Sequence, residues 1–418
     1  MEKLLLESEK CYLCKKPKCK SYCPISTPIP EVIQLFKENK LEEAGKILFE
    51  NNPLSVICAI VCPHETQCVG NCIRGIKGEP VEFCSIEEYI SNYYLDHVEF
   101  ERPTEVRERV AIIGGGPAGI TLAFILGAKG YKVTIFEAHE KIGGVLRYGI
   151  PEYRLSNSLI DKYEKKLKEL GVKIRPNILV GPVVTLEKLF NDGYEAIFIG
   201  TGVWNPRTLD IKGETLGHVH YAIDYLKAPH VYELGRKVCV IGAGDVAMDA
   251  ARTAKRNGAE EVYIIYRSVP ETMTCTKAER DGAILDGVQF EYLKQPVELT
   301  EEGIIYVDTK SEIDENGVET LTYLEETKKL YECDSIIVAV SQSPKNNIVR
   351  NTTGLETNKI GLIKADETGH TTREGVFASG DVVLGARTVV EAVAHSKVVA
   401  QSIEDYINSK RNGSQADR

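Results

Sequence analysis

Residues 110–128 read VAIIGGGPAGITLAFILGA, and this stretch decides the fold. It carries no charge and is long enough to span a bilayer. The turn from Gly114 to Pro117, however, would break a membrane helix near its start. A buried strand, a glycine turn and a buried helix account for the same residues better, and this order opens a mononucleotide-binding βαβ unit. No other segment approaches spanning length, so we expect a soluble protein that does not bind membranes.

The first βαβ unit has the full context of the dinucleotide fingerprint G-x-G-x-x-G. A strand is expected at 110–113, a helix follows the turn, and the next strand, expected at 132–136, ends at Glu137. The glycines allow the tight turn, the close approach of a pyrophosphate and the packing of helix on strand. Glu137 can accept hydrogen bonds from ribose hydroxyls and would repel a 2′-phosphate, which favours an unphosphorylated adenosine. The candidate binding residues are Gly114, Gly116, Pro117, Ala118, Gly119, Glu137 and, in a second close-approach turn, Gly144.

A second unit of the same kind begins about a hundred residues later. Strands are expected at 237–241 and 261–266, with the turn Gly242–Ala247 and a helix between them, and the second strand ends at Arg267. An arginine at this position can accommodate a 2′-phosphate, so NADPH is favoured over NADH. The alternative is that Arg267 is a solvated surface charge. The candidate binding residues are Gly242, Gly244, Asp245, Val246 and Arg267.

Nine of the twelve cysteines lie in the first 84 residues, and eight of them form two quartets. The quartets are Cys11, Cys14, Cys19 and Cys23, and Cys58, Cys62, Cys68 and Cys72. Each quartet contains a Cys-Pro step, which after closely spaced cysteines is typical of 4Fe–4S ligation. All-thiolate zinc sites are the second interpretation. Disulfides are disfavoured because the acidic N-terminus, MEKLLLESEK, lacks the features of a secretory signal, which predicts a cytoplasmic protein with reduced thiols.

Length and composition limit the number of domains and the kinds of partner that we expect. A chain of 418 residues predicts two to three domains, and its formal charge of −10 argues against a nucleic-acid partner or an anionic membrane. Helix-like segments are expected at 29–51 and 85–96, and Ser85 with Glu88 predicts a capping box at the start of the latter. From Val110 onward, short β-branched runs alternate with amphipathic segments, which predicts an α/β fold. The polar end, residues 409–418, is expected to fray.

The sequence shows no substrate chemistry of its own. It contains no nucleophile elbow and no acid–base constellation, and Cys239, Cys275 and Cys333 are isolated, so we interpret them as packing residues. We therefore predict no catalytic side chains and expect the protein to handle electrons through its cofactors.

Taken together, these motifs resemble those of the small (beta) subunit of bacterial glutamate synthase and of the NAD(P)H-side half of dihydropyrimidine dehydrogenase. Segment 50–72 looks closest to the small subunit of bacterial dihydropyrimidine dehydrogenase. The resemblance covers nearly the whole chain and runs through both quartets, Gly114–Gly119, Gly143–Leu155, Gly242–Arg252 and Gly380–Val390.

The resemblance implies an α/β architecture with two Rossmann-like nucleotide-binding domains, preceded by an all-helical domain with two 4Fe–4S clusters. The helical domain would occupy residues 1–105. The FAD domain would occupy 106–230 and 335–418, and the NAD(P)H domain, 231–334, would be inserted into it.

The resemblance also implies roles for particular residues. At the flavin, Asp381 after Gly380 would bond the ribityl chain, the backbone at Thr388 and Val389 would face the pyrimidine edge, and Arg147 would lie near the ring. One cluster would take Cys11, Cys14, Cys19 and Cys72, and the other Cys23, Cys62, Cys68 and Glu87. Cys58 and Cys84 are alternatives to Glu87. Ser268 stands where NADPH-using relatives often carry a second arginine.

The implied function is that of an oxidoreductase subunit. It would pass electrons from NAD(P)H through FAD and two 4Fe–4S clusters to a catalytic partner subunit, of the dihydropyrimidine dehydrogenase or the glutamate synthase type. One alternative is a stand-alone NAD(P)H flavoprotein with a cysteine-rich, zinc-binding interaction module. Another is a self-sufficient enzyme that reduces a small acceptor at the flavin.

Overall fold

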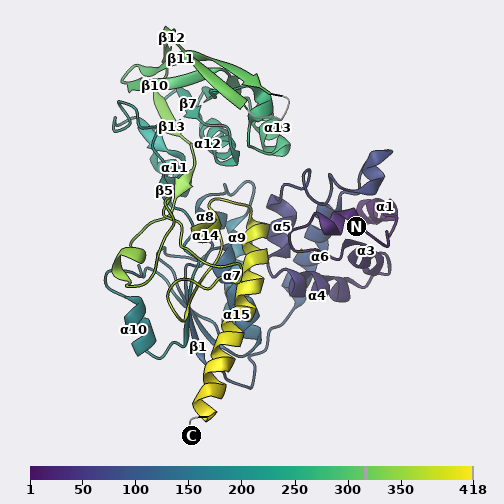
Figure 1. The fold of residues 1–418 in the computed structure, drawn as a ribbon. Coiled ribbons are helices and arrows are strands. Elements are labelled where there is room, and N and C mark those ends of the chain that lie inside the picture. Colours follow the sequence, from purple (N-terminus) through teal and green to yellow (C-terminus); the bar gives the residue numbers. More distant parts are fainter. Residues whose placement is uncertain (315–318, 417–418) are drawn as a thin grey trace. The chain divides into compact units, whose positions relative to one another are not determined.

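The computed structural model describes residues 1–314 and 319–416, with side chains described up to residue 412 (Figure 1). The chain forms two compact units. The first comprises residues 1–147, 152–203 and 343–418, and the second comprises 148–151 and 204–342. The second unit thus also contains residues 204–230, which add a strand and a helix to its sheet. The domain boundaries implied by the family stay a prediction.

The N-terminal part of the first unit is helical. Its helices are α1 (Glu2–Glu9), α2 (Lys18–Ser21), α3 (Ile29–Lys37), α4 (Leu41–Asn51), α5 (Ser55–Val61) and α6 (Phe83–His97), with a 3-10 turn at Ile73–Ile76. The apolar faces of α3, α4 and α6 form one core that includes Val32, Ile33, Ile86 and Ile90. Most of the clustered cysteines lie in the irregular segments between these helices.

Two local predictions in this part are wrong. The helix expected over 29–51 is two helices, because Asn39 adopts a left-handed conformation (φ +58°) between α3 and α4. The helix expected to begin at Ser85 begins at Phe83, and no side chain caps its first turn. Ser85 therefore lies inside α6, and Glu87 lies in its second turn.

A five-stranded parallel sheet in the order β15-β4-β1-β2-β3 forms the rest of the first unit. Its strands are β1 (Arg109–Ile113), β2 (Lys132–Phe136), β3 (Lys173–Arg175), β4 (Ala196–Ile199) and β15 (Val376–Ala378). Because the strands are parallel, the turn after β1 and the segment after β15 leave the sheet at the same edge. Residues more than 250 positions apart in the sequence are thus brought to one site.

Six helices accompany this sheet. They are α7 (Pro117–Ala128), α8 (Val145–Tyr148), α9 (Asn157–Glu169), α10 (Leu186–Asn191), α14 (Asp381–Leu384) and α15 (Val389–Ala416), and a 3-10 turn covers Val349–Asn351. Helix α15 packs on α7 and also contacts α5 of the helical part. Lys397 on α15 donates to both oxygens of Asn51, at 2.5 Å to the backbone carbonyl and 3.0 Å to the side chain. The backbone is helical to Ala416, into the stretch where fraying was expected, and residues 417–418 lie outside the described residues.

The second unit has its own five-stranded parallel sheet, in the order β6-β13-β7-β8-β9. The strands are β6 (Val219–Tyr221), β7 (Lys237–Ile241), β8 (Glu261–Ile265), β9 (Gln289–Glu291) and β13 (Ser335–Val338). Its helices are α11 (Ala222–Lys227), α12 (Asp245–Arg256) and α13 (Lys277–Leu285), with 3-10 turns at Pro229–Val231 and Pro270–Thr272. The alanine-rich face of α12 packs on the valines of β7 and β8, which allows a close approach of helix and sheet.

An antiparallel sheet in this unit was not predicted. It consists of β10 (Lys294–Thr300), β11 (Gly303–Ile313) and β12 (Glu319–Glu332), in that order. The short strands β5 (Asn205–Pro206) and β14 (Gln342–Ser343) pair with each other. Among the residues described, we find no helix whose length and apolar character would let it span a membrane.

Candidate functional site

The turn after β1 and the start of α7 leave no room for a Cβ at Gly114 or at Gly119. Gly114 has φ +101°, and a Cβ there would lie 2.6 Å from the carbonyl oxygen of Gly200. A Cβ on Gly119 would lie 2.0 Å from the carbonyl oxygen of Gly114. Both distances are far shorter than a van der Waals contact, so the turn and the packing of α7 on β1 require glycine, which has no side chain, at these two positions.

A second turn lies against the first. The N–H of Gly143 donates to the carbonyl oxygen of Gly115 at 2.7 Å, and Gly144 has φ +53°. Helix α7 begins at Pro117, with Gly116 as its N-cap and no side chain capping its first turn. The free N–H groups of this first turn, together with the helix dipole, suit a pyrophosphate group.

Glu137 directly follows β2 beside the same turn and is only 4% exposed. Its Oε2 accepts from the N–H of Gly115 at 2.7 Å, and its Oε1 accepts from the N–H of His139 at 2.8 Å. The structure therefore fixes an acceptor group next to the place where the turn would hold a dinucleotide. The contact with His139 was not foreseen from the sequence.

The C-terminal segment reaches this site through β15. Gly380 has φ +74°, and a Cβ there would lie 3.2 Å from the Cβ of Ala118. Asp381 follows, and burial raises the pKa of its carboxyl to about 7, although its Oδ1 accepts from the N–H of Arg387 at 3.3 Å. Such a desolvated carboxyl suits a hydroxyl-bearing chain that would hydrogen-bond to it.

Three other predicted flavin residues have defined surroundings. Arg147 donates to the Asp161 carboxylate at 2.6 Å and to the Ile142 carbonyl at 2.9 Å, so its side chain is held in place. The backbone N–H of Thr388 donates to Glu391 Oε2 at 3.0 Å. That N–H is therefore engaged within the first turn of α15, which begins at Val389.

The turn after β7 repeats the geometry in the second unit. Gly242 has φ +132°, and a Cβ there would lie 2.3 Å from the carbonyl oxygen of Ala339. Gly244 is the N-cap of α12, whose first turn again has no side-chain cap, and Ala247 is fully buried behind it. A second phosphate-binding helix terminus is thus available, and Val246 packs partly against the core.

Segment 273–276 lies against this second turn, a feature that the sequence analysis missed. The N–H of Cys275 donates to the carbonyl oxygen of Ala243 at 3.1 Å, and the N–H of Thr276 donates to Asp245 Oδ1 at 2.8 Å. Arg267 after β8 is exposed, whereas its neighbour Ser268 is buried and accepts from the Thr272 hydroxyl at 2.9 Å. Of these two side chains, only that of Arg267 is exposed and accessible to a bound nucleotide.

The clustered cysteines form two groups that cross between the quartets. Cys72 of the second quartet lies near Cys19 of the first, together with Cys11 and Cys14. Burial raises the pKa of the Cys19 thiol to about 11, and the three neighbouring thiols raise it further. Cys23 of the first quartet lies near Cys68.

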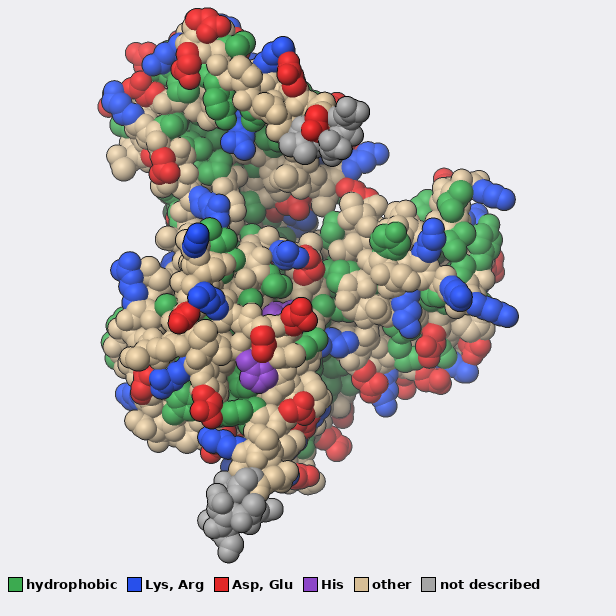
Figure 2. Space-filling view, viewed as in Figure 1, with side chains coloured by type: hydrophobic (Ala, Val, Ile, Leu, Met, Phe, Trp, Pro, Cys, Tyr) green, Lys and Arg blue, Asp and Glu red, His purple; other side chains and the backbone are tan. Residues whose placement is uncertain are grey.

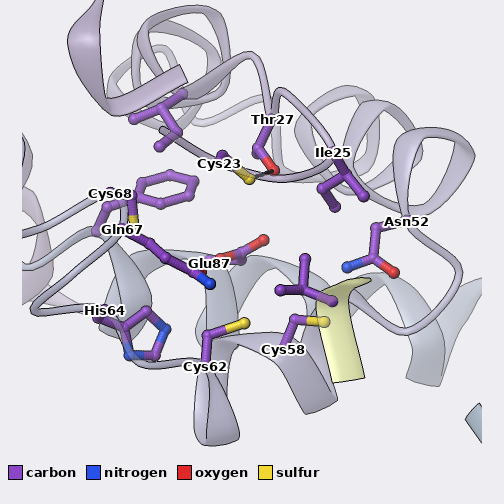
Figure 3. Close-up of a pocket in the computed structure, with 13 residues that line it drawn as sticks. Cys23, Ile25, Thr27, Asn52, Cys58, Cys62, His64, Gln67, Cys68 and Glu87 are labelled. Carbon is purple, nitrogen blue, oxygen red and sulfur yellow. Dashed lines mark hydrogen bonds between the residues drawn. The ribbon is translucent and has the colours of Figure 1, made fainter. Parts of the chain in front are cut away.

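The second group surrounds a cavity (Figure 3). The lining includes Cys23, Cys58, Cys62, His64, Cys68, Glu87 and Val390. Figure 3 shows the Glu87 carboxylate in the middle of this ring, with Cys23 on one side and Cys58 and Cys62 on the other. Cys84 is not part of the lining, and its thiol donates to Glu82 Oε2 at 3.7 Å.

Glu87 is the unusual member of this group. It is 7% exposed, and burial alone raises the pKa of its carboxyl to about 8, since no hydrogen bond from a described residue reaches it. His64 Nε2 on the same cavity is also buried without a partner. Buried polar groups ordinarily have partners, so a missing group of positive charge fits this cavity.

In the described parts of the chain, no three His, Cys, Asp or Glu side chains converge closely enough to hold a single metal ion. A 4Fe–4S cluster has a different requirement, because its four ligands bind four different irons. Thiols grouped around a cavity, with a buried carboxyl among them, fit the ligand set of such a cluster.

Two family models match this chain. Residues 1–98 match the family described as dihydropyrimidine dehydrogenase domain II, 4Fe-4S cluster. Residues 108–396, and in a second match residues 72–189, correspond to the family described as pyridine nucleotide-disulphide oxidoreductase.

Individual relatives cover nearly the whole chain. The glutamate synthase (NADPH) small chain of Halomonas elongata is 33% identical over 427 residues, which cover 96% of this chain and 90% of the relative. The NADP(+)-dependent formate dehydrogenase subunit beta of Moorella thermoacetica is 34% identical over 426 residues, which cover 93% of this chain and 60% of that protein.

Among solved structures, Mycobacterium tuberculosis FprA in complex with NADPH has a TM-score of 0.62 at 18% identity, over 73% of this chain and 86% of FprA, which shows a shared fold. The sequence matches go further: the chain belongs to the family of the glutamate synthase small chain and is an NAD(P)H-dependent flavin oxidoreductase with an N-terminal 4Fe–4S domain.

Proposed function

We propose that the chain is an electron-transfer subunit that oxidises NADPH and delivers the electrons to a catalytic partner subunit. When bound, FAD would supply the conversion of a hydride into single electrons, and two 4Fe–4S clusters would conduct them. The observation that carries the proposal is the coexistence, in one chain, of two dinucleotide turns and two separate cysteine groups.

The first turn is the proposed FAD site. Gly114, Gly116, Pro117, Ala118, Gly119 and Gly144 would hold the pyrophosphate, Glu137 the ribose, and Gly380, Asp381, Thr388, Val389 and Arg147 the flavin end. The support is that the segment after β15 packs on Ala118, so that both halves of this set meet at one edge of the sheet.

The two cysteine groups are the proposed cluster sites. One site would use Cys11, Cys14, Cys19 and Cys72, and the other Cys23, Cys62, Cys68 and Glu87. Glu87 is preferred over Cys58 because its buried carboxyl has no hydrogen-bond partner among the described residues. Cys84 is the weaker alternative because it lies outside the cavity lining.

The start of α15 links the proposed flavin and cluster sites. Val390 lines the cavity and directly follows Thr388 and Val389, the residues proposed for the ring edge. The Glu87 group would therefore be the one next to the flavin.

The proposed partner follows from the relatives. Those proteins are named small chain and subunit beta, which implies that each works with another chain. We propose that this chain likewise passes electrons to a larger catalytic subunit, which would carry the substrate chemistry.

Anaerobic stopped-flow mixing with NADPH tests the function directly. Flavin absorbance should bleach first, and the broad absorbance of the clusters should fall afterwards, with about eight irons per chain expected from two 4Fe–4S clusters. Flavin reduction with clusters that stay oxidised would rule out the relay, and zinc in place of iron would favour the stand-alone flavoprotein with an interaction module.

Replacement of Arg267 by Gln should raise KM for NADPH by roughly tenfold, because a charged hydrogen bond to phosphate contributes about 1.5–3 kcal/mol. KM for NADH and kcat should not change. The matched control is Arg236→Gln, since Arg236 precedes β7 at the opposite edge of the sheet and is exposed. Steady-state rates with menadione as acceptor give both constants. An equal rise of KM for both nucleotides would show that Arg267 does not read the 2′-phosphate.

A further inference from the structure

The segments around the first cysteine group expose apolar side chains. Tyr12 is 63% exposed and Ile76 is 73% exposed, and Leu13 and Ile73 are exposed as well. Tyr12 and Leu13 lie between Cys11 and Cys14, and Ile73 directly follows Cys72. Segments 12–20 and 73–77 touch each other, because the Arg74 guanidinium lies 5.9 Å from the centroid of the Tyr12 ring. We call the surface formed by these two segments the Tyr12–Ile76 face.

This face is basic although the chain is acidic. Segments 12–20 and 73–77 contain six basic residues and no acidic one, in a chain of formal charge −10. Lys15, Lys16, Lys18 and Lys20 are exposed, and none of them has an ion pair with a described residue. The nearby acids Glu7 and Glu79 both pair with Lys10, at 2.7 and 3.5 Å. Figure 2 shows basic and apolar side chains side by side on the part of the molecule that carries the N-terminal helices.

We propose that the Tyr12–Ile76 face is the docking surface for an acidic electron-accepting protein, an inference that rests on the function proposed above. The lysines would attract and orient a negatively charged partner, and the exposed apolar side chains would form the dry centre of the contact. Electron transfer slows steeply with distance, so an acceptor must approach one of the cluster sites. At this face the side chains that would touch the acceptor are sequence neighbours of Cys11, Cys14, Cys19 and Cys72.

The electron balance sets the stoichiometry. Each NADPH gives up a hydride, which supplies two electrons and leaves NADP⁺, and one proton is released to solvent. Two molecules of a one-electron acceptor are therefore reduced for each NADPH. A bound partner subunit would take both electrons without leaving, whereas a small one-electron acceptor must leave the face after each transfer, which suits a small, salt-sensitive contact.

The probe for this face is rubredoxin, a small acidic protein that accepts one electron at a single iron. The holoenzyme with Lys16→Glu and Lys18→Glu should reduce rubredoxin with NADPH about tenfold more slowly than the unmodified protein at low ionic strength, and the difference should shrink at high salt. Lys165→Glu on α9, also exposed and without an ion pair to any residue that the structure describes, is the matched control and should have no effect. Reduction of menadione, a small neutral acceptor, should be the same in all three proteins.

Two further measurements keep the outcomes separate. Iron content and cluster reduction by NADPH are measured on each variant. The milder pair Lys16→Gln and Lys18→Gln removes the two charges without reversing them and should give an intermediate rubredoxin rate. It replaces the Glu pair if charge reversal disturbs the cluster. Equal rubredoxin rates in variant and unmodified protein, with clusters reduced normally, would overturn the docking surface and leave the relay intact. A concentration-dependent dimer that the Lys→Glu variant abolishes would overturn it too, because a second copy would then occupy the face. Clusters that NADPH does not reduce would count against the relay itself.

Discussion

Replacing Cys68 by Ala should remove about half of the protein's iron, from about eight to about four atoms per chain, because one of two 4Fe–4S clusters would lose a ligand. Glu87→Ala should have the same effect, since both residues line the one cavity. Cys58→Ala should keep the full iron content, although Cys58 lines that cavity as well. Iron and acid-labile sulfide assays on anoxically purified protein provide the measurement.

The comparison of these variants also identifies the fourth ligand. Loss of iron in Cys58→Ala together with full iron in Glu87→Ala would assign the position to the thiol and contradict the choice of the carboxylate. Cys84→Ala is a further control, because Cys84 lies outside the cavity lining. Metal binding contributes to folding energy, so the variants that lose iron should also unfold their N-terminal helices more easily. Hydrogen exchange over residues 1–98 would detect that change.

Replacing Gly119 by Ala should yield a protein that does not retain FAD. The added Cβ would lie 2.0 Å from the Gly114 carbonyl oxygen, so either α7 or the glycine turn must move. Forcing extra atoms into a packed interior typically costs about 1–3 kcal/mol, and here the displaced atoms are those that would face the pyrophosphate. The flavin absorbance of the purified protein and its recovery on addition of free FAD measure the effect.

Gly217→Ala is the matched control for that substitution. A Cβ at Gly217 meets nothing within 4 Å, and its backbone is not left-handed. The control should bind FAD as the unmodified protein does. Full flavin occupancy in Gly119→Ala would show that the turn can relax and that the close packing of α7 on β1 is not required for binding.

The sequence predicts the two nucleotide units well because their determinants are local. The strand expected at 132–136 and the one expected at 237–241 have the bounds of β2 and β7, and the others deviate by one residue at one end. Glycine turns, β-branched strands and buried helices leave their pattern within about thirty residues, so the units can be read without knowledge of distant contacts.

The remaining features depend on contacts that no local pattern encodes. The break at Asn39 divides one amphipathic stretch into two helices, and the long strand β12 carries mostly exposed side chains without a clear alternation. The crossing of the cysteine groups was suggested by family resemblance alone, because irregular segments of this length give no spacing rule for which thiols meet. Segment 273–276, which lies on the second turn, is short and has no periodic pattern, so it gave no signal in the sequence.

The contacts of helix α15 constrain how the two ends of this chain can evolve. Its first turn borders the proposed flavin site, Val390 belongs to the wall of the cysteine cavity, and Lys397 holds the end of α4 through Asn51. A chimera that exchanges only the first hundred residues between homologues would place its cysteines against an α15 from another protein, whose side chains need not fit the cavity. The N-terminal cysteine segments and α15 must therefore co-evolve. A successful chimera would have to transfer the C-terminal helix together with the N-terminal part.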